Sequence, residues 1–537
     1  MKKYLKNILP LAAGLVLTVG MASCTKDLDV TPLDPNMSTE LDVNGLFNKC
    51  YATIAMAGNG GANGDCDIDG IDGGTSGYVR QMWNSNELTT DEAICGWGDD
   101  GIAQSCFNTY DESHPMLNGY FARLTTAITY CNQYLTVASD YDQTMTAEIR
   151  FLRALHYYLL MDAFGRVPFA ESLGDPVIYS RQEIYDWIEK ELLENVEPYL
   201  SEAKPKKSSD SMYGRVDKAS AWILLSRLYL NAEVYTGTPQ WEKAATYAKK
   251  VMDSGYKLNT TSVNGWSAYQ MLFMGDNGES DAANEAIFPI LQDGLTTTSW
   301  GTSLFLIAST FDSDMHAVAG DDQTTNGVSG QVWGGNRARS ALIAKFFPNV
   351  DEAPNVESYV MPFVAQDDRA IFDGVGRTVL AEDPATFKSG FAVAKFINVK
   401  SDGSNGHDAT FPDADFFFFR TAEAYLTYAE ATARLNGGSA TADGVAAINA
   451  VRSRANAVTR SGYSLNDILD EWSREFYFEG RRRVDLIRFG KFGGNSDYKW
   501  EWKGGTLIGR NFDSYRNIFA IPASQLSTYG NVQNPGY

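Results

Sequence analysis

The stretch that decides the fold runs from residue 147 to residue 165 and reads AEIRFLRALHYYLLMDAFG. Its apolar side chains recur every three or four positions, which is the period of an amphipathic α-helix. Val167-Pro168-Phe169 follows it directly. The stretch therefore predicts a long helix over 147–164 in a mostly α protein. His156 lies within this helix, and we interpret it as a packed core residue rather than a catalytic base.

Similar apolar stripes predict helices elsewhere in the chain. One stripe runs over 221–229, and a shorter one over 244–251 ends near Gly255. Helices over 422–429 and 445–455, separated by Gly437-Gly438, predict a second antiparallel pair. Single helices are predicted over 119–137 and 181–200. Because no strict 34-residue period is visible, these are degenerate pairs of the tetratricopeptide (TPR) type rather than a regular solenoid.

Between these helical regions the chain becomes rich in Gly, Thr and Asn. Long irregular segments inside a folded protein are more often functional than accidental. We therefore predict a single domain over 39–537. Its helical scaffold is expected mainly at 118–255 and 420–490, and a loop-rich binding lobe with few short strands mainly at 58–105 and 256–419.

Composition narrows the range of partners. The 537 residues carry a formal net charge of −22, which argues against nucleic acid and anionic lipid head groups, since like charges repel. The chain also has 11 Trp, 28 Tyr and 28 Phe. Most of these rings are expected in the core, but some flat aromatic faces remain for binding.

The N-terminus has the pattern of a secretory signal. Lys2, Lys3 and Lys6 precede an apolar run over 8–19, and Met21-Ala22-Ser23-Cys24 follows. The small residues before Cys24 resemble a bacterial lipobox, which predicts a signal over 1–23 and a lipid anchor on Cys24. The alternative is ordinary cleavage that leaves Cys24 free. Residues 24–38 are polar with two prolines and are predicted to form a flexible tether.

Motifs of catalysis are missing from the sequence. It contains four histidines and no zinc-protease pair, nucleophile elbow, Walker loop or dinucleotide fingerprint. A glycoside hydrolase needs only two carboxylates, so this class stays open as an alternative. Five cysteines remain beyond Cys24. An odd number cannot all pair, and we interpret them as mostly buried small apolar residues with at most one disulfide.

Two long motifs carry a family resemblance. The stretch 147–169 and the stretch 471–490, EWSREFYFEGRRRVDLIRFG, are similar to the signatures of the SusD/RagB family. Ile521-Pro522 and the terminal QNPGY at 533–537 extend the similarity to the end of the chain. The resemblance implies a TPR-like SusD fold and an outer-membrane lipoprotein facing the cell exterior. It also implies a non-enzymatic protein that captures glycans for a SusC-like TonB-dependent transporter.

The resemblance also implies a set of carbohydrate-binding residues. Matched to the family's starch-binding founding member, they are Trp97, Trp300, Trp333, Arg80 and Asp100. Trp97 and Trp333 have glycine neighbours, which favours exposed loops. Trp333 lies in an insertion, and Cys95 and Asp100 replace a tryptophan and an asparagine of that member. These changes keep a different glycan open as an alternative to starch or malto-oligosaccharides.

A structural Ca²⁺ site is the last feature that the resemblance implies. Asp413 and Asp415 match a calcium-binding pair, and the acidic loop 275–281 would add Asp276 and Asp281. Carboxylate oxygens from two segments suit Ca²⁺. The alternative is a solvated acidic turn that binds no ion.

Overall fold

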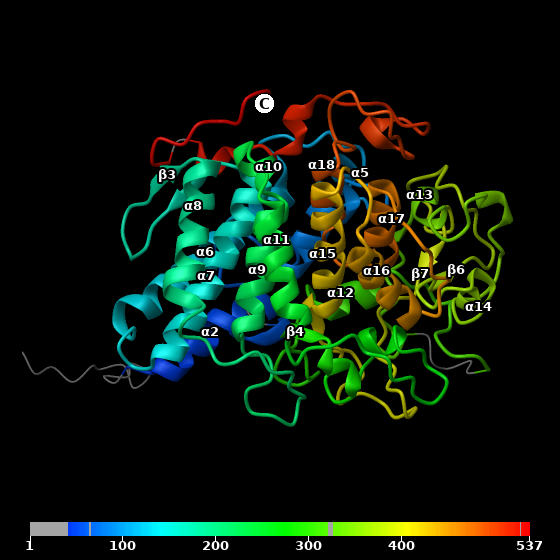
Figure 1. The fold of residues 1–537 in the computed structure, drawn as a ribbon, viewed down its shortest axis with the longest axis horizontal. Helices are drawn as coiled ribbons and strands as arrows, with labels where there is room; N and C mark the ends of the chain where they lie inside the picture. The colour runs from blue at the N-terminus through cyan, green and yellow to red at the C-terminus, as the bar shows by residue number, and fades with distance from the viewer. Residues whose placement is uncertain (1–40, 64–65, 321–325, 527) are drawn as a thin grey trace, which may run out of the picture. The chain divides into compact units, whose positions relative to one another are not determined.

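The computed structural model describes residues 41–63, 66–320, 326–526 and 528–537. Helices dominate these residues, and short strands pair two by two (Figure 1). Residues 46–537 form one compact unit. The predicted signal, tether and lipidated Cys24 lie outside the described residues, so the predicted division of the chain stays a prediction.

The deciding stretch forms the long helix α7 (Gln143–Phe164), which packs against α6 (Pro115–Val137). Asp142 begins α7 by accepting a hydrogen bond from the Met145 amide. Gly165 ends it at a φ of 72°, a backbone conformation that favours glycine. His156 is fully buried, and burial lowers its pKa to about 3. Its Nδ1 lies 2.7 Å from the Tyr78 hydroxyl, which confirms a packed core histidine.

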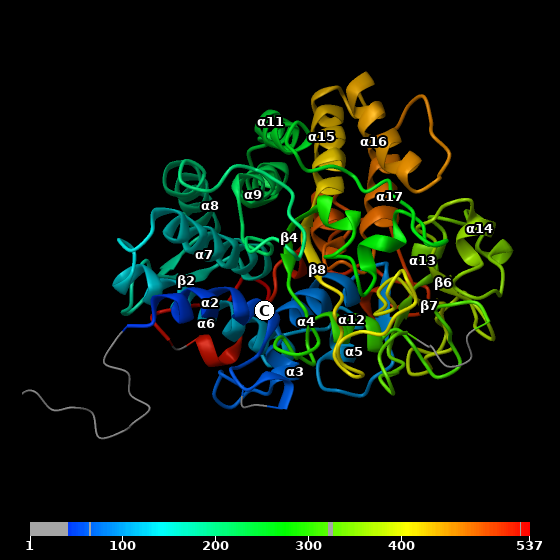
Figure 2. The same cartoon turned by 90° about the horizontal axis from the view of Figure 1, so that it is seen from below.

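The predicted helix pairs are present. The helix α11 (Trp241–Met252) packs between α9 (Lys218–Leu230) and α15 (Thr421–Leu435), and α16 (Ala442–Arg454) packs on α15 (Figure 2). Alanines such as Ala244 and Ala248 of α11 are fully buried, which lets the helices approach closely. The predicted helix over 181–200 is α8 (Arg181–Glu191), continued by a π-helical turn at Leu192–Val196.

The strands are short, and two of the four pairs join distant parts of the chain. The strand β1 (Ala93–Cys95) pairs with β5 (Asn336–Ala338), and β4 (Ala286–Ile290) pairs with β8 (Phe416–Arg420). The local pairs are β2 (Val167–Phe169) with β3 (Val177–Tyr179), and β6 (Phe372–Asp373) with β7 (Ala392–Val393). All four pairs are antiparallel. The mostly α fold class with few short strands is confirmed.

Shorter helices fill the segments between these elements. They are α2 (Val43–Ala55), α3 (Gly73–Ser76), α4 (Tyr78–Trp83), α5 (Ile102–Cys106), α10 (Ala232–Thr236), α12 (Ser303–Ala308), α13 (Ser340–Ile343), α14 (Met361–Ala365), α17 (Leu465–Phe476) and α18 (Arg482–Arg488). A π-helical turn at Asn84–Leu88 follows α4, and single 3-10 turns lie at Gly61–Asn63, Gln270–Phe273, Asp281–Asn284, Val350–Glu352, Lys503–Gly505, Ser514–Asn517 and Ala523–Gln525. None of the helices in the described residues is long and apolar enough to span a lipid bilayer.

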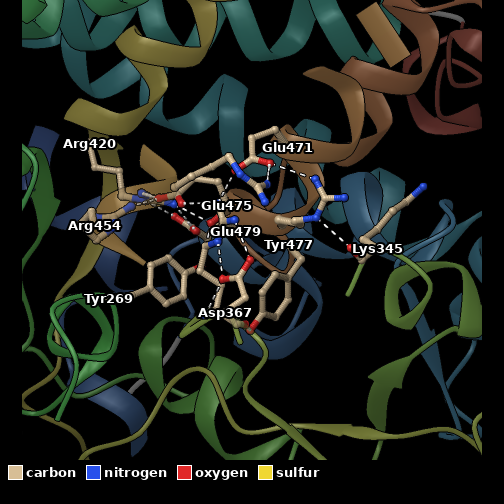
Figure 3. A network of polar contacts seen from close by, with 12 residues as sticks. Tyr269, Lys345, Asp367, Arg420, Arg454, Glu471, Glu475, Tyr477 and Glu479 are labelled. Carbon is tan, nitrogen blue, oxygen red and sulfur yellow. Dashed lines mark hydrogen bonds and ion pairs between the residues drawn. The ribbon is translucent and has the colours of Figure 1, made fainter. Parts of the chain in front are cut away.

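Most charged residues of the stretch 471–490 lie in the core, and several of them belong to a buried ionic network (Figure 3). Glu475 of α17 pairs with Arg420, Arg454 and Arg369. Burial alone would raise the pKa of Glu475, but these three guanidinium groups outweigh it and lower the pKa to about 2. A second carboxylate on the same helix, Glu471, pairs with Arg369 across 2.7 Å. This part of the motif therefore joins α17 to distant segments.

Each of the five cysteines within the described residues is a free thiol. Cys50, Cys95, Cys106 and Cys131 are buried, and Cys66 is half-buried. The interpretation of these cysteines as mostly buried apolar residues is confirmed, and the single disulfide that the sequence allowed is not formed among them.

Candidate functional site

The three tryptophans chosen from the sequence lie next to one another in one cluster, which we call the indole arc (Trp97, Trp333 and Trp300). The ring centroids of Trp97 and Trp333 are 6.2 Å apart, and those of Trp333 and Trp300 are 6.3 Å apart. The rings are tilted by 54° and 41° rather than stacked face to face. All three side chains are half-buried. Trp333 is thus the central ring of a curved aromatic surface.

Strand pairing brings two of these rings together across 236 residues of sequence. Trp97 lies two residues after β1 and Trp333 lies three residues before β5, and these strands pair with Cys95 opposite Asn336. The Gly96 amide continues the ladder by donating to the Gly335 carbonyl oxygen across 3.1 Å. A Cβ on Gly335 would lie 2.2 Å from Cε2 of Trp97. Only glycine at this position lets the indole pack so closely on the backbone.

Each indole N–H group donates a hydrogen bond within the protein, and this bond fixes the orientation of its ring. Trp97 donates to the Trp333 carbonyl oxygen across 3.2 Å, and Trp333 donates to Oε1 of Gln331 across 2.9 Å. Trp300 donates to the Ala62 carbonyl oxygen across 2.9 Å. Since these polar edges are satisfied, binding by the arc would use the flat ring faces.

Arg80, on α4, lies against the arc. Its guanidinium carbon is 5.6 Å from the centroid of the Trp97 ring and 5.0 Å from that of Phe305. Its Nε atom is buried without a hydrogen-bond partner among the described residues. Burial lowers the pKa of Arg80 despite the nearby Asp99. Arg80 therefore offers donors beside an aromatic surface, which a ligand rich in hydroxyl groups can satisfy.

Among the described residues, neither Asp100 nor Cys95 adds a ring or a side-chain hydrogen bond to the indole arc. Asp100 is exposed in the loop that follows Trp97, and no hydrogen bond joins it to the arc within the described residues. Cys95 is buried, and its amide donates to Sγ of Cys106 across 3.4 Å. The position that holds a tryptophan in the founding member therefore contributes no ring here. The role of Asp100 stays a prediction.

Comparisons with known proteins agree with this fold and these motifs. The starch-binding protein SusD of Bacteroides thetaiotaomicron is 39% identical over an alignment 575 positions long, which covers 100% of this chain and 99% of that protein. This chain belongs to the SusD family. The SusD family model matches residues 375–537. SusD-family glycan-binding proteins are non-catalytic, so this member is not an enzyme, and the hydrolase alternative is set aside.

Solved structures share the SusD-like fold. Surface glycan-binding protein A from Bacteroides uniformis superposes with a TM-score of 0.64 at 21% identity, covering 92% of this chain and 98% of that one. A laminarin-binding SusD-like protein gives a TM-score of 0.64 at 20% identity, covering 93% and 100%. At these identities the likeness establishes the fold alone.

Sequence reasoning missed three side chains that pack on or orient the rings of the arc in this SusD-family protein, and of these Phe305 is fully buried. Phe411 meets Trp300 edge-on with a centroid distance of 5.1 Å, and Phe305 meets Trp97 in the same way at 6.3 Å. Gln331 orients Trp333. Phe411 comes directly before Pro412 in the predicted calcium segment, so its place in the sequence gave no sign of an aromatic role.

The four carboxylates predicted to bind calcium have hydrogen-bond or ionic partners within the protein. Asp413 lies 3.1 Å from Nζ of Lys400, Asp281 pairs with Lys207, and Asp276 accepts from the Ser401 amide. Asp415 accepts from the Tyr213 hydroxyl across 2.7 Å. Within the described residues no three His, Cys, Asp or Glu side chains converge as metal ligands. As arranged, these residues do not form a calcium cage, and the calcium site stays a prediction.

Proposed function

We propose that this SusD-family protein captures α-glucans, namely starch and malto-oligosaccharides, at the cell surface. The observation that supports this function is the indole arc with Arg80 beside it. The C–H faces of a pyranose ring are apolar and stack on aromatic rings, while its hydroxyl groups accept hydrogen bonds from donors such as Arg80. Because the three rings are tilted in series, their surface suits a curved α-linked chain better than a flat β-linked one.

The relative that binds starch adds support for the ligand class. It is named for that activity, and it is 39% identical along the whole length of this chain. Trp97, Trp300 and Arg80 occupy positions that the family resemblance assigned to binding, and they lie in one cluster. Asp100 would contribute an acceptor at the rim of the site, since it is exposed close to Trp97.

The proposal includes delivery of the sugar to a transporter. A lipid on Cys24 would hold the protein on the outer membrane with its site facing the exterior, and a SusC-like TonB-dependent transporter would accept the sugar. Cys24 lies outside the described residues, so these two elements rest on the lipobox pattern and on family membership. Co-purification of a TonB-dependent transporter with the lipidated protein from detergent-solubilised outer membranes would test the partner.

Affinity electrophoresis tests the ligand class. Native gels cast with amylopectin, xylan, pectin or mucin are run beside a gel without polysaccharide. We expect retardation in amylopectin alone, and release of no reducing sugar from starch or pullulan. Retardation in another gel but not in amylopectin would show that the protein captures a different glycan. That second candidate is favoured by Cys95, which replaces a ring of the starch-binding member, and by the insertion that carries Trp333.

A structural calcium ion at Asp413, Asp415, Asp276 and Asp281 is a separate part of the proposal. Burial, with a further contribution from the neighbouring Asp413 and Asp293 charges, raises the pKa of Asp415 to about 7. A cation would relieve this repulsion, although Lys400 already supplies a positive charge to Asp413. A melting temperature that rises by several degrees between EGTA and millimolar CaCl₂, and no longer does so in Asp413→Asn, would support the ion. Equal melting temperatures would contradict it.

A further inference from the structure

A cavity of about 260 Å³ opens beside the indole arc. Trp300 lines it, together with residues of the segments 57–62 and 66–74, which include Gly58, Gly61, Gly73 and Gly74. Cys66 also lines it. Four of the lining residues are glycines, which have no side chain to fill the space. The volume is just below the range of about 300–1,000 Å³ that is typical of pockets for small molecules.

The position of the cavity relative to the arc decides what it can hold. A Cβ on the wall residue Gly74 would come within 3.1 Å of Nη1 of Arg80. The same guanidinium group packs on Trp97. The cavity therefore borders Trp300, which is one end of the arc, and the guanidinium group that packs on Trp97 lies close to its wall at Gly74. A space beside the end ring of the arc can hold a sugar unit that branches from a chain stacked on the rings.

The polar groups at the cavity match the hydroxyl groups of a sugar. Asp72 lines the cavity, and its carboxylate accepts hydrogen bonds from the amide and the hydroxyl of Thr75. Two carboxylate oxygens offer about four acceptor positions, so some remain for a ligand hydroxyl. Nη1 of Arg80 and Oδ1 of Asp72 each lie 3.1 Å from the position that a Cβ on the wall residue Gly74 would take, so a donor lies close to this wall. The ring of Trp300 supplies an apolar face for stacking.

We propose that this cavity is a branch subsite, which binds one sugar unit attached as a side branch to a main chain stacked on the indole arc. The inference rests on the proposed function, because the main chain must occupy the arc. A linear chain fills only the arc. A chain that carries one α-1,6-linked glucosyl unit would fill the cavity as well, so the protein prefers branched α-glucans to linear ones.

Calorimetry with two matched sugars tests the subsite. The ligands are linear maltohexaose and a maltohexaose that carries a single α-1,6-linked glucosyl branch. We expect the branched sugar to bind the wild-type protein about tenfold more tightly. In Ala57→Leu, three added carbon atoms enter the cavity, and the branched sugar falls to the affinity of the linear one, which itself is unchanged. Trp97→Ala weakens both sugars, because it removes part of the arc.

A measurement on the unmutated cavity supports the test if Ala57→Leu folds poorly. Cys66 is half-buried, whereas the other four described cysteines are buried, and methyl methanethiosulfonate should label it. We expect the branched sugar to slow this labelling at least fivefold, and the linear sugar at equal occupancy to leave it unchanged. The Cys66→Ser variant, which lacks this thiol, gives the background level of labelling.

The outcomes separate this inference from the function on which it rests. If both sugars bind equally and protect Cys66 equally, the branch subsite is wrong and the proposed function stands. If the linear sugar binds and the branched sugar is excluded, the branch subsite is likewise wrong. If neither sugar binds, the proposed function fails, and the branch subsite fails with it.

Discussion

The indole nitrogen of Trp97 donates a hydrogen bond to the main-chain carbonyl oxygen of Trp333 across 3.2 Å. The two rings come from segments 236 residues apart, and each helps to hold the other in place. A ligand that meets this surface does not have to order it first, so less binding energy is lost to entropy. The backbone under these rings is therefore as important for binding as the rings themselves.

Gly335→Ala tests this preorganisation. The new methyl carbon would lie 2.2 Å from the Trp97 ring, so the indole must move and the contact with Trp333 breaks. We expect the affinity for maltoheptaose, measured by calorimetry, to fall at least tenfold. The fold should survive, because the ring can swing toward solvent.

Gly98→Ala is the matched control for that substitution. A Cβ at Gly98 meets nothing within 4 Å, so its affinity should equal that of the wild type within twofold. Equal affinities for Gly335→Ala and the wild type would show that the position of the Trp97 ring does not control binding.

The pH dependence of stability should report the buried carboxyl pair Glu87 and Glu92. Burial raises the pKa of Glu92 to about 7 and also raises the pKa of Glu87, where the Glu92 charge adds to the effect. Stability from such groups is fully present below their unfolded pKa of 4.5 and is lost as the pH rises through about 7. For Glu92 this loss is on the order of 3 kcal/mol between pH 4.5 and pH 8.

Glu92→Gln isolates this effect. A neutral amide resembles the protonated acid, so the free energy of unfolding in urea should vary less between pH 5 and pH 8 than in the wild type. Glu112→Gln, at an exposed position, is the control and should follow the wild-type curve. The interpretation is wrong if Glu92→Gln also follows that curve.

Removal of one charge from the buried ionic network should lower the free energy of unfolding more than removal of an exposed charge. Glu475→Ala leaves Arg420 and Arg454 buried without one of their partners, and removal of one partner from such a network costs about 3–5 kcal/mol. Lys249→Ala removes the exposed pair with Asp253 and should cost less than about 1 kcal/mol. Urea denaturation measures both. Similar losses in the two variants would mean that the network adds little to stability.

Local patterns in the sequence predicted the scaffold well. The stripe over 147–164 became α7, and the stripes over 221–229 and 244–251 became α9 and α11, because packing of an apolar face depends on neighbours three and four residues away. The family resemblance points to Trp97 and Trp333, and the glycines that flank them favour exposed loops. The helical stripes and the flanking glycines are local signals.

Features that depend on long-range pairing could not be predicted in this way. The register of β1 with β5 joins residues more than 230 positions apart, and it decides that Trp97 contacts Trp333. The burial of Phe411 against Trp300 has no periodic signal. The charges of 471–490 resemble a solvated helix face in sequence, yet Glu475 and Arg483 are fully buried, since their partners lie in other segments.

Maltoheptaose titration of the triple variant Trp97→Ala, Trp300→Ala and Trp333→Ala tests the central claim most directly. Calorimetry is run beside the wild type, with circular dichroism to verify that the helices of both proteins match. If the indole arc binds the α-glucan, the wild type gives a saturable binding heat and the triple variant gives none. A triple variant that is folded and binds maltoheptaose with the wild-type affinity would contradict the account.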